Sequence, residues 1–138
     1  MISFSIETQF EFLKTKAASK WLSSIISNES RGEGEISIVL CNDDFLYKLN
    51  VEFLNHDTLT DVISFDYSVG NEVHGEIFIS VERVRENAVE FEQVFETELY
   101  RVMAHGVLHF CGYKDKTAAE SSLMRSKEDF YLQQLMNN

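Results

Sequence analysis

Two histidines one helical turn apart are the residues of this chain best suited to bind a metal ion. His105 and His109 stand at positions i and i+4 of an apolar stretch with helical spacing. Side chains at this spacing project from the same helix face, with Cβ atoms about 5–6 Å apart, so both imidazoles can reach one ion at about 2 Å. Such pairs also arise by chance as core or surface histidines, and the pair alone is a weak indication of a metal.

The residues after His109 add a turn and a third ligand. Gly112 is the residue type that tolerates the left-handed conformation just past a helix end, and a chain that turns there can return its next side chains to the same helix face. Asp115 carries a carboxylate suited to that ligand position. Three protein ligands leave a coordination position open, as in catalytic rather than structural zinc sites. We therefore expect one Zn²⁺ per chain, bound by His105, His109 and Asp115.

An open zinc site supports hydrolysis of more than one substrate class. The ion lowers the pKa of a bound water from 15.7 to about 7 and can polarise a phosphoryl oxygen, so cleavage of a phosphodiester and of a peptide are both chemically reasonable. Metallopeptidases with H-E-x-x-H place a glutamate general base after the first histidine, where this chain has Gly106. This departure argues against a peptidase. Beyond the metal-bound water, no catalytic residue can be assigned.

The elements that must position these residues follow from periodicity. Alternating or β-branched segments predict strands over 2–6, 36–40, 62–65 and 76–79. Helical spacing and capping residues predict helices over about 10–27, 42–54, 80–91 and 96–112, with a last helix after the capping box of Thr117 and Glu120. Residues 28–34 are expected to form a turn. The order predicts an α/β (α+β) single domain over residues 1–138, a small four-stranded mixed sheet packed against about five helices.

The length and the net charge of the chain limit the functions it can have. The 138 residues, of which 44% are hydrophobic, suit one core, and the net charge of −11 excludes attraction of the whole molecule to nucleic acid or to an anionic membrane. No apolar stretch approaches the roughly 18 residues of a membrane span. Cys41 and Cys111 are too few for a disulfide framework. We expect buried free thiols in a cytoplasmic protein.

The basic residues are concentrated near the histidines. Residues 101–138 carry five basic and four acidic side chains, whereas the rest of the chain is strongly acidic. Arg101, Lys114 and Lys116 are therefore candidates for binding substrate phosphates, and a solvated face is the alternative. The acidic run at positions 82, 86, 90, 92, 96 and 98 is expected to form an outer surface.

Three segments resemble a known family. His105–Tyr113, Thr60–Phe65 and Gly75–Ser80 are similar to the characteristic motifs of the YbeY family, single-domain bacterial metal-dependent endoribonucleases. The resemblance implies a single-strand-specific endoribonuclease acting in rRNA processing, including 16S rRNA 3′-end maturation, and in ribosome quality control. Its implied partners are rRNA and the small ribosomal subunit or its proteins, with no nucleotide cofactor.

The chain departs from the family pattern at positions that matter. Asp115 stands where the family usually has its third histidine ligand, and this harder oxygen donor leaves Mn²⁺ or another divalent ion as an alternative to zinc. A second alternative is that Asp115 does not bind the ion, and that water or another side chain completes the site. Leu54 replaces an arginine that the family commonly places before Thr60. His56 and His74 are most simply a loop histidine and a structural or solvated one.

Two other functions remain open at this point. One is a zinc-dependent peptidase-like hydrolase with related site geometry. The other is a non-catalytic ribosome-assembly factor in which the metal mainly holds the last helices together.

Overall fold

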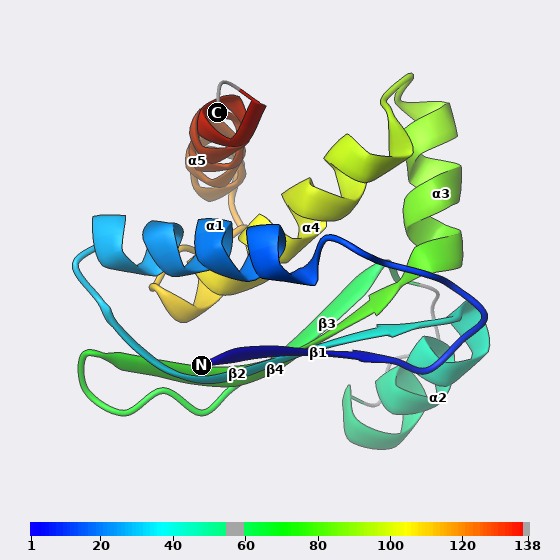
Figure 1. The fold of residues 1–138 in the computed structure, drawn as a ribbon, viewed down its shortest axis with the longest axis horizontal. Helices are drawn as coiled ribbons and strands as arrows, with labels where there is room; N and C mark the ends of the chain where they lie inside the picture. Colours follow the sequence, from blue (N-terminus) through cyan, green and yellow to red (C-terminus); the bar gives the residue numbers. More distant parts are fainter. Residues whose placement is uncertain (55–59, 137–138) are drawn as a thin grey trace.

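A four-stranded mixed sheet forms the middle of the structure (Figure 1). The computed structural model describes residues 1–54 and 60–136. The strands are β1 (Ile2–Ile6), β2 (Gly32–Cys41), β3 (Val62–Asp66) and β4 (Glu72–Ser80), in the spatial order β1-β2-β4-β3. β2 runs parallel to β1 and β4, and β3 is antiparallel to β4. The predicted mixed sheet is confirmed.

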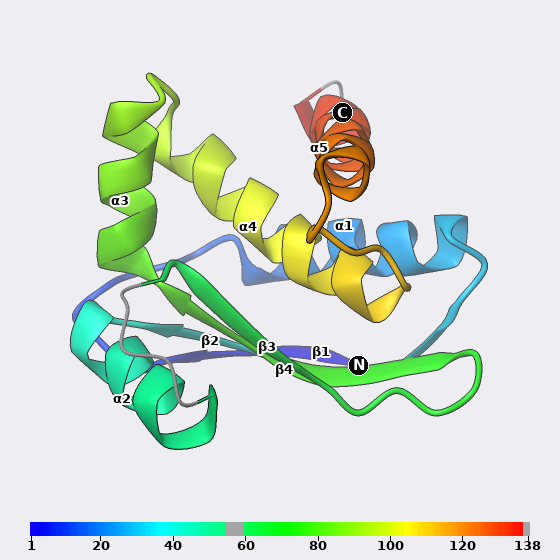
Figure 2. The ribbon, with the colours of Figure 1, turned by 180° about the vertical axis from the view of Figure 1, so that it is seen from behind.

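Helices cover both faces of the sheet. The described residues form α1 (Thr15–Asn28), α2 (Asp43–Leu54), α3 (Val81–Glu90), α4 (Phe95–Phe110) and α5 (Ala118–Met136). α1 and α4 lie against one face with α5 stacked beyond them, and α2 lies on the opposite face (Figures 1 and 2). The predicted fold class, with five helices, is confirmed. No helix within the described ranges has the length and apolar content to cross a membrane.

The alternation of β2 explains why both faces are covered. Ile36, Ile38 and Leu40 belong to the main core under α1 and α4, whereas Cys41 joins a smaller cluster with Leu46 of α2. Both cysteines are free and buried, as expected. Burial raises the pKa of the Cys41 thiol to about 12 and that of Cys111 to about 11, so neither thiol is poised to react.

Two predicted boundaries in the first third of the chain were wrong. The first helix begins at Thr15 rather than near Phe10, because Phe10 packs on Phe95 and Phe12 on Tyr100 from a segment that is neither helix nor strand. The predicted turn over 28–34 ends early, because β2 begins at Gly32 and its first residues pair with β4. In both cases tertiary contacts override the local pattern.

The predicted starts of α3 and α5 agree with the structure. The Ser80 hydroxyl accepts a hydrogen bond from the backbone N–H of Arg83 at the start of α3. Before α5, Thr117 Oγ1 accepts from the Glu120 N–H, and the Glu120 carboxylate accepts from the Thr117 N–H. This reciprocal pair is the capping box that the sequence predicts, and it fixes where the chain enters α5 after leaving α4.

Glu29, the residue that ends α1, connects three parts of the fold. Its carboxylate accepts hydrogen bonds from the hydroxyls of Tyr113, at 2.7 Å, and Tyr131, and the Lys127 ammonium lies 3.4 Å away. Burial alone raises the pKa of Glu29, but these hydrogen bonds and the lysine charge outweigh it, so the pKa lies below its ordinary value of 4.5. Glu29 therefore ties α1 to α5 and to the turn after α4.

We predict that Glu29→Gln lowers the free energy of unfolding by about 1–3 kcal/mol near neutral pH, the range for a hydrogen-bonded charged group. Because the folded protein favours ionised Glu29, this contribution is present above pH 4.5 and is lost as the pH falls through the folded pKa. Urea unfolding across this range should show the gap between wild type and variant closing in acid. Glu90→Gln, on the exposed face of α3, is the control, and a gap independent of pH would contradict the assignment.

Candidate metal centre

The α4 helix presents His105 and His109 side by side. Their rings lie edge to face with centroids 4.6 Å apart, and their Nε2 atoms are 3.1 Å apart. α4 can lie close to the sheet here because residue 106 is glycine, where a Cβ would lie only 2.8 Å from Ile77 Cδ1. The i, i+4 spacing thus brings the two imidazoles together as predicted.

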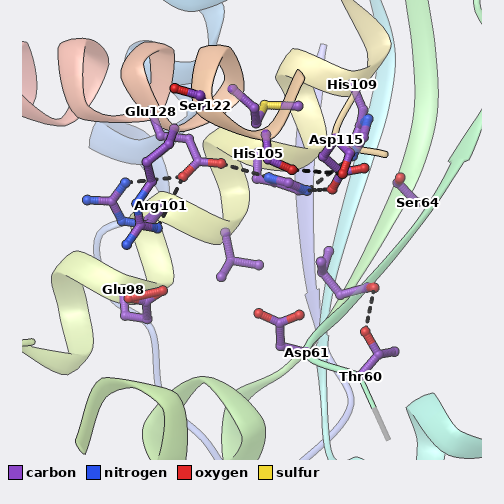
Figure 3. A pocket seen from close by; sticks show the side chains of 15 residues that line it. Thr60, Asp61, Ser64, Glu98, Arg101, His105, His109, Asp115, Ser122 and Glu128 are labelled. Atoms are coloured by element: carbon purple, nitrogen blue, oxygen red, sulfur yellow. Dashed lines mark hydrogen bonds and ion pairs between the residues drawn. The ribbon is translucent and has the colours of Figure 1, made fainter. Parts of the chain in front are cut away.

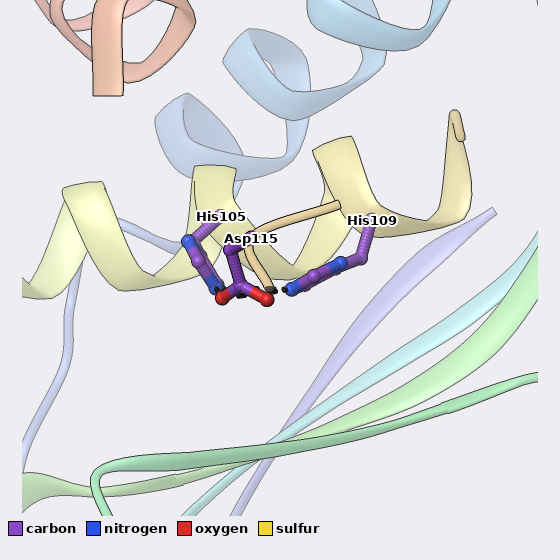
Figure 4. A group of neighbouring side chains, drawn as sticks. All are labelled: His105, His109 and Asp115. Atoms are coloured by element: carbon purple, nitrogen blue, oxygen red, sulfur yellow. Dashed lines mark hydrogen bonds and ion pairs between the residues drawn. The ribbon is translucent and has the colours of Figure 1, made fainter. Parts of the chain in front are cut away.

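The turn after α4 returns Asp115 to the same place. Gly112 has a φ of 108°, a conformation open to glycine and costly for other residues, and the N–H of Tyr113 donates to the Leu108 carbonyl to close the turn. Asp115 Oδ2 then lies 3.2 Å from His105 Nε2 and 3.5 Å from His109 Nε2. Figure 4 shows the three side chains converging.

These distances suit a tetrahedral metal ion. Two ligand atoms, each about 2.0–2.1 Å from a tetrahedral ion, are about 3.3–3.4 Å apart. The three observed separations are 3.1, 3.2 and 3.5 Å. The three residues can therefore hold a metal ion, and all three line one cleft from which a further ligand can approach.

The outer nitrogen of each ring is held by an acceptor. His105 Nδ1 lies 2.7 Å from Glu128 Oε2, and His109 Nδ1 lies 2.9 Å from the carbonyl oxygen of Tyr113. A carbonyl oxygen and an ionised carboxylate accept but do not donate, so each Nδ1 carries the proton and each Nε2 presents a lone pair. With neutral rings, two lone pairs and a carboxylate then face one another. A cation among them relieves this repulsion.

The carboxylates near His105 favour a positive charge on or beside its ring. Burial lowers the pKa of His105, but the hydrogen bond and charge of Glu128, together with Asp115, outweigh it and raise the pKa above its ordinary value. Glu128 is itself only 4% exposed and also receives a hydrogen bond from Arg101 at 3.1 Å. The carboxylates that favour a proton on His105 favour a metal ion in its place.

The site opens on a cleft of about 730 Å³ between α4, the first turns of α5 and the start of β3. Figure 3 shows its polar lining, which includes Asp61 from the start of β3 and Glu98, Arg101 and Glu128 from the two helices. Pockets of about 300–1,000 Å³ suit small organic ligands. A nucleotide or a short segment of polymer fits this size.

The three candidate phosphate-binding residues are placed differently. Arg101 lines the cleft, and its guanidinium pairs with Glu128 and, at 2.8 Å, with Asp129. Lys114 and Lys116 flank Asp115 on the exposed turn and do not line the cleft. The structure therefore brings Arg101, and not the lysines, up to the metal site.

Sequence reasoning missed three acidic residues of the cleft, Asp61, Glu98 and Glu128. Glu98 was expected on an outer surface, but it is only 6% exposed and lines the cleft. Its spacing from Arg101 and His105 on α4 is the signal that could have identified it. Glu128 had no such signal, because it lies on another helix and reaches His105 only through the tertiary fold.

The other predicted histidines play no part in the described site. His74 Nδ1 accepts a hydrogen bond from the Glu35 N–H, and its Nε2 lies 2.6 Å from Glu72, which agrees with the structural role expected for it. His56 lies outside the described residues. Leu54 ends α2 and is 40% exposed.

We predict that Glu128→Gln weakens metal binding about 10- to 100-fold, because the carboxylate that orients His105 is lost. Titration of metal-free protein against a chromophoric chelator measures the affinity. Asp129→Asn is the matched control, since its carboxylate pairs with Arg101 but not with the histidine. Equal affinities for the two variants would refute the orienting role of Glu128.

Comparison with known proteins agrees with the resemblance in the sequence. A family model described as "Endoribonuclease YbeY" matches residues 3–136. Proteins named Endoribonuclease YbeY from Flavobacterium johnsoniae and Phocaeicola vulgatus are 59% and 38% identical to this chain, over 94% of it in each case and over 93% and 94% of the relatives.

A solved structure is also similar. The solution structure of TM1509 from Thermotoga maritima has a TM-score of 0.71 and 30% sequence identity, covering 99% of this chain and 90% of that protein. The fold, the motif around His105 and His109 and the match over nearly the full length therefore agree. The chain belongs to the endoribonuclease YbeY family.

Proposed function

We propose that this protein is a single-domain, metal-dependent endoribonuclease that cuts single-stranded RNA in rRNA processing. The proposal includes maturation of the 16S rRNA 3′ end and ribosome quality control, with the small ribosomal subunit or its proteins as partners in the cytoplasm. It is supported by the family of the chain and by the name of its relatives. The observation that carries it is the convergence of His105, His109 and Asp115 at the edge of a cleft.

We propose Zn²⁺ as the resident ion, held by these three residues. When bound, such an ion polarises a phosphoryl oxygen and makes water easier to deprotonate. Glu128 and the Tyr113 carbonyl hold the two rings by their Nδ1 atoms, which leaves both Nε2 atoms free to bind the ion. Their contribution is preorganisation, because the ligands need no rearrangement when the ion binds.

Arg101 is the residue we expect to contact an RNA phosphate inside the cleft. Its guanidinium is fixed by Glu128 and Asp129, and fixed donors hold an anion at lower entropic cost than mobile ones. Lys114 and Lys116 are exposed on the turn beside Asp115, where they can meet phosphates of the strand outside the cleft. Such surface contacts weaken as salt is added.

The peptidase alternative finds no support at the position where a general base would be needed. Gly106 is buried against Ile77, and a Cβ there would already contact the isoleucine side chain. A glutamate at this position does not fit. The non-catalytic alternative is separated from the proposal by the experiment that follows.

We predict that His105→Ala and Asp115→Ala each lose the bound ion and lower cleavage of single-stranded RNA at least about 100-fold, because a catalytic metal acts only when held. Elemental analysis and a labelled-RNA assay on the same preparations measure both effects. His74→Ala removes a histidine that does not line the cleft and should keep ion and cleavage. Cleavage that survives loss of the ion would indicate a contaminating nuclease or the non-catalytic role.

We further predict that Asp115→His shifts metal preference toward Zn²⁺ and away from Mn²⁺ by about tenfold or more, because a nitrogen donor replaces a harder oxygen donor. Competition between the two ions for the metal-free protein measures the ratio. Asp129→Asn serves again as a carboxylate change outside the ligand set. An unchanged ratio would mean that Asp115 does not bind the ion.

A further inference from the structure

Glu98 is a buried acid whose carboxylate pairs with no other residue in the described part of the chain. The residue is 6% exposed, and no described residue makes a hydrogen bond or ion pair with its carboxylate. Arg101 and Arg125 influence it only through longer-range charge. A buried polar group without a hydrogen bond is costly and calls for an explanation.

The carboxylate of Glu98 faces the cleft. Among the described residues, no fully buried side-chain oxygen lacks a hydrogen-bond partner, so the small exposed area of Glu98 includes its oxygens. Glu98 is one of the residues that line the cleft, and Figure 3 shows it on the α4 wall with Asp61 across from it. Burial raises the pKa of Glu98, because burial disfavours the charged form of a carboxyl group.

Its place on α4 fixes its distance from the metal site. Glu98 precedes His105 by two helical turns, about 10 Å along the axis. An RNA phosphate at the ion cannot itself touch Glu98, but the base of an adjacent nucleotide can. Val62, Val102 and Met124 line the same cleft, and they supply an apolar surface for the face of a base.

The chemistry of a carboxylate selects one base. An ionised carboxylate offers two acceptor oxygens and no donor. The Watson–Crick edge of guanine presents two adjacent donors, N1–H and the N2 amine, whereas the other bases place an acceptor beside a donor on this edge. Unstacked bases of single-stranded RNA are commonly recognised through that edge.

We propose that Glu98 is a specificity-determining residue that accepts two hydrogen bonds from a guanine next to the cleaved phosphate. The inference rests on the proposed function, because it needs RNA in the cleft. A second metal ion at Glu98 is less well supported, since the only three-ligand group within the described ranges is the one at His105. A guanine base supplies directly the two hydrogen-bond donors that the Glu98 carboxylate lacks.

The test is cleavage of a single-stranded RNA pool of random sequence, with both product ends sequenced. Wild type should prefer guanine at one position adjacent to the cut by about tenfold, within the range of a bidentate base contact. Glu98→Gln offers one acceptor and one donor, so the guanine preference should be lost and adenine, cytosine and uracil should be accepted instead. Glu98→Ala should show no preference there. Metal content and circular dichroism establish that each variant folds and keeps its ion.

A binding measurement separates this inference from the proposed function. With metal-loaded protein and oligomers whose linkages are non-hydrolysable methylenephosphonates, fluorescence anisotropy compares a short adenosine oligomer carrying one central guanosine with the same oligomer carrying inosine, which lacks the N2 amine. Wild type should bind the guanosine oligomer several-fold more tightly, and Glu98→Gln should not.

The cleavage and binding experiments distinguish failure of the Glu98 role from failure of the nuclease proposal. RNA cleavage with the same base pattern in wild type and Glu98→Gln overturns the role of Glu98 and leaves the nuclease proposal standing. A guanine preference in binding that Glu98→Gln removes, in a wild type that cuts no RNA, supports the role of Glu98 and overturns the nuclease proposal.

Discussion

Lone pairs on two imidazole nitrogens and a carboxylate face one another across about 3 Å, and the surrounding structure keeps them there. Such an arrangement is repulsive unless a cation or a proton lies among the three atoms. His105 is held from outside by Glu128 of α5, and His109 by the Tyr113 carbonyl. The fold must therefore bring α5 and the turn at Gly112 to the same face of α4, and most of its other features serve that requirement.

Glu29 and Trp21 connect α1 to the turn after α4 and to α5. Glu29 binds the hydroxyl of Tyr113, the residue whose carbonyl orients His109, and it also binds Tyr131 of α5. The Trp21 indole donates to the Tyr131 carbonyl at 2.9 Å, which adds a second link between α1 and α5. α1 never reaches the cleft, yet it fixes the two elements that do. Stability and site geometry therefore depend on the same contacts.

Local chemistry made part of this structure predictable. The helical spacing of His105 and His109, the glycine at 112 and the capping box before α5 all act over a few residues, and each was found as expected. Contacts across long sequence separations were not predictable in this way. Glu128 reaches His105 from another helix, and Glu98 looked like one more residue of an acidic run until the fold enclosed it. The resemblance to a family supplied the substrate class, which no spacing of residues gives.

The balance of charge in the cleft would give a bound divalent ion a role in substrate entry as well as in chemistry. Four acidic residues line it, Asp61, Glu98, Asp115 and Glu128, against two arginines, at positions 101 and 125. Such a lining repels a phosphate at short range, and the chain as a whole repels it at long range. A divalent ion at the histidines would cancel the local excess of negative charge. The acidic composition that first argued against RNA is thus compatible with an RNA substrate, provided that the phosphate enters a cleft whose metal site is filled.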